Sequence, residues 1–299
     1  MLRAPLLLIL VIPVRLVAQD PSFVHHPTRS EHLFSEEMEP AYVLGNDVAV
    51  RATPDLQGGL VATFSAGTKV WLEDRGADTL VVHGIGSTWF RVKAGEHEGW
   101  VWGGNIAQCA FGSTTDPTVK FVGGINHIVR PTGEDRIDFA YRIVALRNGT
   151  ELDRLVVRSF AWGFGMVQNL GNPGLQNVDD VITLEVPCVG GCGCSTGDVV
   201  VFWSGGKFHH VTDLMGSPDA EYSSGSSFLY PSDMEGSPGM VIKVTSTYDE
   251  APLQAMEYGN PKELTRIVLR EYLAWNGQQL VPSARPTEER RYQLPLGDE

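Results

Sequence analysis

The sequence predicts an all-β protein, with a small barrel followed by a larger antiparallel β domain that contains hairpin repeats. Three observations support this class. Short apolar runs alternate with polar residues at a period near two, as in half-buried strands. Residues that favour turns are frequent, with 33 glycines and 18 prolines in 299 residues. Strong strand-like runs also flank several short sequences that favour tight turns.

The N-terminal 18 residues are predicted to be a secretory signal peptide. Arg3 precedes an apolar run over residues 4–14, and the small residue Ala18 marks the cleavage site. The run is shorter than the ~20 apolar residues of a membrane helix, and no later stretch approaches that length. We therefore expect a secreted or periplasmic protein without a membrane span. The polar, proline-containing residues 19–42 are interpreted as a linker.

Residues 43–109 are predicted to form the small barrel. Six strand-like runs follow one another with short polar breaks: DVAVRA, LVATF, TKVWLED, TLVVHGI, TWFRVKA and GWVW. In TWFRVKA, the alternation places Trp89 and Arg91 on one face of the strand. Phe90 and Val92 would then face the other way. Six short strands in so little sequence are typical of a small barrel.

Residues 118–283 are predicted to form the larger antiparallel domain. Its expected hairpin turns are Asn148-Gly149, Ser204-Gly205-Gly206 and Asn276-Gly277. Asn-Gly favours a type I′ turn because both residues tolerate a positive φ. Tryptophans immediately precede two of these turns, which indicates a weak hairpin repeat.

One segment of this domain has two interpretations. Asn260-Pro261 is a good helix start, and the apolar residues that follow also fit a helical face. We prefer the strand of a hairpin there. The last residues, 284–299, are interpreted as a polar tail.

Residues 46–107 resemble the bacterial SH3-like (SH3b) domain. The segments VAVRATP, GTKV, WFRV and GWVWGGNIA follow that family's order of V-R-x-x-P, G-T-x-V, W-x-x-V and G-W-V. The stretch 73–86 is longer than in the family, which leaves its loop conformation open. The resemblance implies a non-enzymatic barrel that binds peptidoglycan peptides or other envelope ligands. Three later segments are GLQNVDDVITLEV, VVVFWSGGKF and SSFLYPSDMEGSPGMVIKV. Through them the remaining chain resembles the C-terminal region of secreted Bacteroidetes proteins that carry a β-rich domain of unknown role.

Four tryptophans are the candidate ligand-binding residues of the barrel: Trp71, Trp89, Trp100 and Trp102. Rigid aromatic rings bury a large area with little loss of side-chain entropy, so they suit stacking on peptide or sugar. Alternatively, Trp100 or Trp102 packs inside the barrel, and core packing is preferred for Trp100. The expected ligand is a cell-wall peptide or glycan, with peptidoglycan as a candidate, or another envelope protein.

The charge balance argues against nucleic acid as a partner. The formal net charge is −13, and no basic stripe offsets it. Such a surface repels phosphate backbones. No cofactor is expected. The carboxylates at Asp179-Asp180 and at Asp233 and Glu235 could contact a cation, but solvated loop carboxylates are the preferred interpretation.

The four cysteines are expected to form disulfides, because export would place them in an oxidising compartment. Cys192 and Cys194 are too close in sequence to bridge without strain, since their Cα atoms lie ~6.5–7 Å apart in an extended chain. If all four oxidise, Cys109 pairs with one of them and Cys188 with the other. A zinc site made of these thiols and nearby histidines is less favoured, because C-x₃-C-x-C is not a familiar zinc spacing.

The main alternative function is a papain-like cell-wall cysteine peptidase. STGDVVVFWSGGKFHHVTDL resembles the G-D-x-V-x-F…H-V segment of these enzymes, which implies that His210 is the catalytic base. Cys194 precedes His210 by too few residues for a nucleophile helix and the intervening strands, and no helical periodicity follows Cys109. The sequence therefore favours a non-enzymatic envelope protein.

Overall fold

The computed structural model describes residues 40–129, 138–159, 164–187, 196–218, 223–248 and 263–295. These residues form strands in three antiparallel sheets and one 3-10 turn, and none of them is in an α-helix. The predicted all-β class is thus confirmed. No helix that could cross a membrane occurs within the described ranges.

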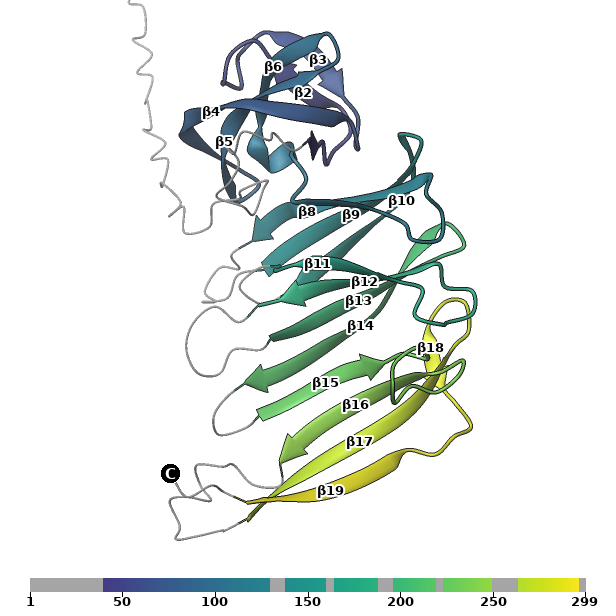
Figure 1. The fold of residues 1–299 in the computed structure, drawn as a ribbon. Coiled ribbons are helices and arrows are strands. Elements are labelled where there is room, and N and C mark those ends of the chain that lie inside the picture. Colours follow the sequence, from purple (N-terminus) through teal and green to yellow (C-terminus); the bar gives the residue numbers. More distant parts are fainter. Residues whose placement is uncertain are drawn as a thin grey trace, which may run out of the picture.

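The first sheet has the strand order β1-β4-β5-β6-β2-β3 and curls into a half-barrel (Figure 1). Its elements are β1 (Ala41–Tyr42), β2 (Val48–Arg51), β3 (Leu60–Phe64), β4 (Lys69–Val82), β5 (Ile85–Ala94), β6 (His97–Trp102) and the 3-10 turn η1 (Gly103–Asn105). Phe90, Val92 and Val101 point into its core. Phe90 and Val92 share a face, as the strand period predicts. The hydrophobic interior of the half-barrel is therefore aliphatic with a few phenylalanines, and no tryptophan belongs to it.

The two strands expected between residues 68 and 86 are one long strand, β4. Its pairing with β5 shifts register between Leu72 and Asp74 and again between Arg75 and Thr79. Extra residues at such bulges bend a strand without ending it. The irregular stretch therefore behaves as bulges inside a strand, and not as the expected break.

The second sheet has the order β10-β9-β8-β7 and is covered on both faces. Its strands are β7 (Cys109–Gly112), β8 (Val119–Val129), β9 (Asp138–Arg147) and β10 (Thr150–Ser159). On β9, Tyr141 and Ile143 pack toward the third sheet. Val144 and Leu146 pack toward the half-barrel, together with Leu44. The alternation of side chains along one strand thus joins the half-barrel to the rest of the molecule.

The third sheet runs through the C-terminal half of the chain (Figure 1). Its strands are β11 (Val167–Gly171), β12 (Asp180–Val186), β13 (Thr196–Ser204), β14 (Lys207–Pro218), β15 (Ser223–Leu229), β16 (Val241–Tyr248), β17 (Glu263–Trp275), β18 (Leu280–Pro282) and β19 (Glu288–Pro295). The region expected to be one β domain therefore contains two sheets. Strand β19 pairs with β17, so the interpretation of residues 284–299 as a polar tail was wrong for this strand.

Two of the three predicted hairpin turns have the expected form. Asn148 and Gly149 have φ of 50° and 82° and join β9 to β10, while Gly205 and Gly206 have φ of 58° and 78° and join β13 to β14. The third turn is longer, because β17 and β18 meet at Trp275 and Leu280. β17 is a strand, so the helical alternative for this segment was wrong.

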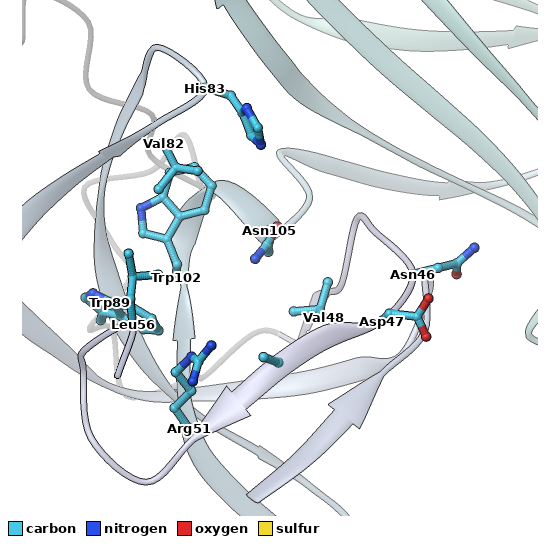
Figure 2. Close-up of a pocket in the computed structure, with 11 residues that line it drawn as sticks. Asn46, Asp47, Val48, Arg51, Leu56, Val82, His83, Trp89, Trp102 and Asn105 are labelled. Atoms are coloured by element: carbon cyan, nitrogen blue, oxygen red, sulfur yellow. The ribbon is translucent and has the colours of Figure 1, made fainter. Parts of the chain in front are cut away.

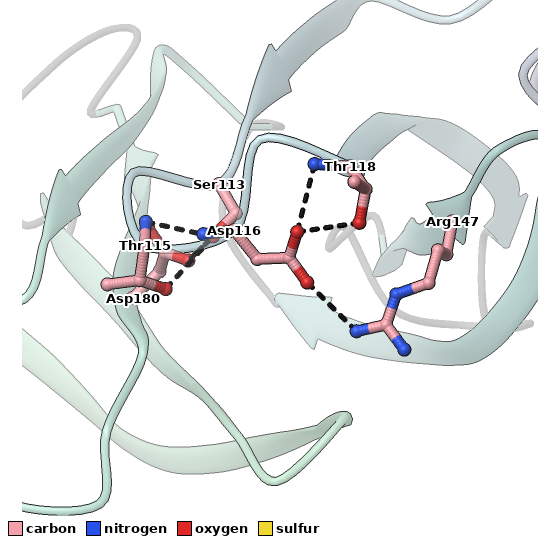
Figure 3. A network of polar contacts seen from close by, with 6 residues as sticks. All are labelled: Ser113, Thr115, Asp116, Thr118, Arg147 and Asp180. Atoms are coloured by element: carbon pink, nitrogen blue, oxygen red, sulfur yellow. Dashed lines mark hydrogen bonds and ion pairs between the residues drawn. The ribbon is translucent and has the colours of Figure 1, made fainter.

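A buried carboxylate connects the second and third sheets (Figure 3). Asp180, at the start of β12, is 0% exposed, so the expectation of a solvated loop carboxylate was wrong for this residue. It accepts hydrogen bonds from the Ser113 hydroxyl, from the backbone N–H and hydroxyl of Thr114 at 2.8 Å each, and from the amide of Asn169 at 3.0 Å. These bonds fix the β7–β8 loop to β11 and β12.

Candidate functional site

A pocket of about 300 Å³ lies on the outer face of the half-barrel (Figure 2). β2, the β4–β5 turn, β5, β6 and η1 all contribute to its walls. β2 pairs with β6 at a single position, between Arg51 and Trp100. A second pocket of about 180 Å³ adjoins it and shares five lining residues: Asn46, Val48, His83, Trp102 and Asn105. We refer to the two pockets together as the His83 groove.

The β4–β5 turn places His83 at the groove. Val82 and Ile85 are strand partners, so His83 and Gly84 form a two-residue turn with φ of 52° and 78°. The turn is fixed to the second sheet, because the Ile128 N–H donates to the His83 carbonyl at 3.0 Å. A Cβ on Gly84 would lie 2.1 Å from the Ile128 carbonyl oxygen, so only glycine fits there. The imidazole therefore projects from a rigid turn.

Trp89 and Trp102 form one wall of the groove. They are direct partners on β5 and β6 and lie on the outer face of the sheet. Their exposed fractions are only 5% and 6%, because both pack into the cluster between the half-barrel and the sheets. The Trp102 indole N–H lies 3.2 Å from the carbonyl oxygens of both Leu80 and Ser87. These rings are thus a fixed and largely buried wall of the groove, and not free stacking platforms.

The other two candidate tryptophans lie outside the groove. Trp71 is 37% exposed, and the Lys69 ammonium is 5.0 Å from its ring centre. Trp100 is half-buried and packs at the margin of the cluster that contains Trp102. The expectation that Trp100 fills the barrel interior was wrong, because Val101 takes that position. The structure therefore brings together two of the four candidates.

Polar side chains define the rest of the groove. Figure 2 shows the His83 imidazole and the Asn105 amide directed toward the same space. Asn46 holds the rim, since its amide oxygen accepts the Ala66 N–H at 3.0 Å and its amide nitrogen donates to Glu151 at 3.0 Å. Arg51 is engaged as well, donating to the Gly58 carbonyl at 2.7 Å. A fixed aromatic wall opposite amide and imidazole groups suits a polar ligand.

Sequence reasoning missed these polar residues for identifiable reasons. His83 was placed inside a strand-like run, although histidine is enriched at positive φ and glycine adopts it readily, so His-Gly could form a turn. Asn46 and Asn105 flank strands and carry no pattern of their own. The second pocket also includes Asn126 and Arg142, which the second sheet contributes and which no local pattern links to the half-barrel.

The described cysteine does not behave as predicted. Cys109 is a free thiol, so the bridge expected from it is not present. Its sulfur lies 3.3 Å from the Tyr141 hydroxyl, and burial raises the pKa of the thiol to about 11. The remaining cysteines, Cys188, Cys192 and Cys194, lie outside the described residues. Among the residues that the structure describes, no group of three or more potential metal ligands is present.

The residues of the alternative peptidase site are also separate. His210 on β14 is exposed, and its Nε2 lies 2.7 Å from the carboxylate of Asp213, which raises the pKa of the imidazole. Cys109 contacts Tyr141 and Gly123, not His210. Burial keeps the Cys109 thiol protonated, whereas a nucleophile requires a lowered pKa. This pair therefore does not form a cysteine–histidine site.

Comparison with known proteins found no matching family model, curated protein or solved structure. The His83 groove combines aromatic, amide and imidazole groups from elements distant in sequence.

Proposed function

We propose that this protein is an exported, non-enzymatic envelope protein that binds a peptide or glycan ligand in the His83 groove. The observation that carries the proposal is the groove itself, a pocket of about 300 Å³ with Trp89 and Trp102 on one side and His83 and Asn105 facing the same space. Ligand sites commonly combine apolar walls with a few well-placed polar groups. Peptides and sugars offer the matching apolar faces and hydrogen-bonding groups.

The resemblance of residues 46–107 to SH3b domains supports the choice of ligand class, and purified peptidoglycan is the first candidate. The predicted signal peptide at residues 1–18 supports export. No catalytic step is included in the proposal, because the geometry around His210 and Cys109 favours none.

The binding test is a co-sedimentation assay with purified peptidoglycan sacculi. The variant His83→Asn removes the imidazole but retains the turn, because asparagine tolerates a positive φ. His97→Asn is the matched control, since His97 is an exposed histidine of β6 that does not line the groove. We expect the wild type and His97→Asn to sediment with the sacculi and His83→Asn to bind at least several-fold more weakly.

The exposed tryptophan supplies a second comparison. If Trp71→Ala abolishes binding while His83→Asn binds normally, the ligand binds at the surface around Trp71 and Lys69. The assignment of the ligand to the His83 groove is then wrong. If the wild type does not sediment at all, peptidoglycan is not the ligand. Trp102→Ala is a poor probe, because it would remove the buried ring that the structure packs against Gly104.

A further inference from the structure

Arg142 is a charged side chain that the second sheet contributes to the His83 groove. It lies on β9, on the face that packs against the half-barrel, and it lines the second pocket. Its Nε is buried and has no hydrogen-bond partner. Burial is also the main cause of a lowered pKa for this guanidinium. A buried donor without an acceptor is unfavourable unless another molecule supplies one.

The charge of Glu151 favours the ionised Arg142 side chain, but the hydrogen bonds of this carboxylate go to other residues. Glu151 receives two hydrogen bonds from the guanidinium of Arg154, at 2.6 and 2.7 Å, and a third from Asn46 at 3.0 Å. The pairing of Glu151 with Arg154 and Asn46 fixes the half-barrel loop to the β9–β10 hairpin. The other arginine of the groove, Arg51, donates to a backbone carbonyl. Arg142 therefore lines the groove with a buried Nε that has no hydrogen-bond partner among the described residues.

We propose that Arg142 binds a carboxylate of the ligand that occupies the His83 groove. The inference rests on the proposed function and adds the chemical class of the recognised group. A guanidinium presents paired N–H donors that match the two oxygens of a carboxylate. Amides of Asn105 and Asn126 line the same pocket and can supply further hydrogen bonds. Because the pockets share their central residues, one ligand can contact both His83 and Arg142.

The test compares sacculi with free carboxylates and sacculi whose carboxylates have been converted to amides. Arg142→Met removes the guanidinium and retains an unbranched apolar stem. Arg147→Gln is the matched control, because Arg147 lies on the same strand and loses the same charge but is exposed and paired with Asp116 at 3.0 Å. Urea unfolding midpoints establish that each variant is folded before its apparent Kd is measured.

We expect the wild type and Arg147→Gln to bind untreated sacculi and to bind amidated sacculi about 10-fold more weakly or worse. Arg142→Met should bind both preparations equally, at the weaker level. The inference is refuted if folded Arg142→Met binds untreated sacculi as tightly as the wild type does. It is also refuted if the wild type binds amidated and untreated sacculi with the same apparent Kd. In either case the proposed function stands. If the wild type binds neither preparation, the proposed function fails and the inference fails with it.

Discussion

Replacing Asp180 should reveal how strongly one buried carboxylate holds the second and third sheets together. The side chain is fully buried and accepts hydrogen bonds from Ser113, Thr114 and Asn169. Asp180→Ala removes the carboxylate, so the groups that donate to it lose this acceptor. A hydrogen bond to a charged group contributes about 1.5–3 kcal/mol.

Adding the contributions of all these hydrogen bonds would overestimate the loss in the free energy of unfolding. The Asn169 amide also donates to the Gly112 carbonyl at 3.0 Å, and the Ser113 hydroxyl lies 3.2 Å from that of Thr115. Thr114 is exposed, so water can satisfy its groups. We therefore expect Asp180→Ala to lower the free energy of unfolding by about 3 kcal/mol. Asp180→Asn, which keeps the shape and one acceptor, should lose about 1–2 kcal/mol.

Urea denaturation followed by tryptophan fluorescence provides the measurement, because Trp203 packs between these two sheets. Asp179→Asn is the control, since it removes a charge at the neighbouring position without touching the network, and it should change stability by about 0.5 kcal/mol or less. A loss below about 1 kcal/mol for Asp180→Ala would refute the reasoning. It would mean that packing alone holds the β7–β8 loop against β11 and β12.

Three further predictions follow from individual residues. Gly149→Ala should destabilise the protein by about 1–2 kcal/mol through its positive φ alone, since a Cβ there meets no atom within 4 Å. Gly84→Ala should cost at least about 1 kcal/mol more, because its Cβ also meets a backbone carbonyl of β8; equal urea midpoints for the two variants would contradict this. Asp213 raises the pKa of His210, so the protonated imidazole is favoured in the fold, and the resulting stabilisation is present at low pH and lost as pH rises through the raised pKa. In an NMR titration of Asp213→Asn, the pKa of His210 should return toward its ordinary value. An unchanged His210 pKa would exclude Asp213 as the cause of the shift. Burial raises the pKa of Cys109 to about 11, so iodoacetamide at pH 8 should label it slowly in the native protein and rapidly in urea. Peptide mapping resolves this position, and rapid native labelling would show that the thiol is accessible.

Much of the local structure was predictable from the sequence. The period of two predicted that Phe90 and Trp89 face opposite ways, and that Trp100 and Trp102 share a face opposite Val101, as the structure shows. It did not indicate which face is buried in the half-barrel. Asn148-Gly149 predicted its turn because the steric cost of a positive φ depends on the residue itself. These features depend on neighbours along the chain, so the chain alone was enough to indicate them.

Features set by contacts between distant segments were not predictable in this way. Asp180 was interpreted as a solvated carboxylate, and only the docking of the β7–β8 loop made it a buried acceptor. Trp100 and Trp102 share a strand face, but the packing of that face against other sheets decided how little of Trp102 is exposed.

The residues of the His83 groove divide in the same way into those that local sequence indicated and those that only tertiary contacts brought together. The sequence by itself identified four candidate tryptophans in the barrel, and two of them, Trp89 and Trp102, line the groove. It gave no sign that β9 would bring Arg142 beside His83, because strand order within and between sheets is not encoded in any local pattern. Burial, charge compensation and pocket shape depend on which surfaces meet, and that was decided by the tertiary structure.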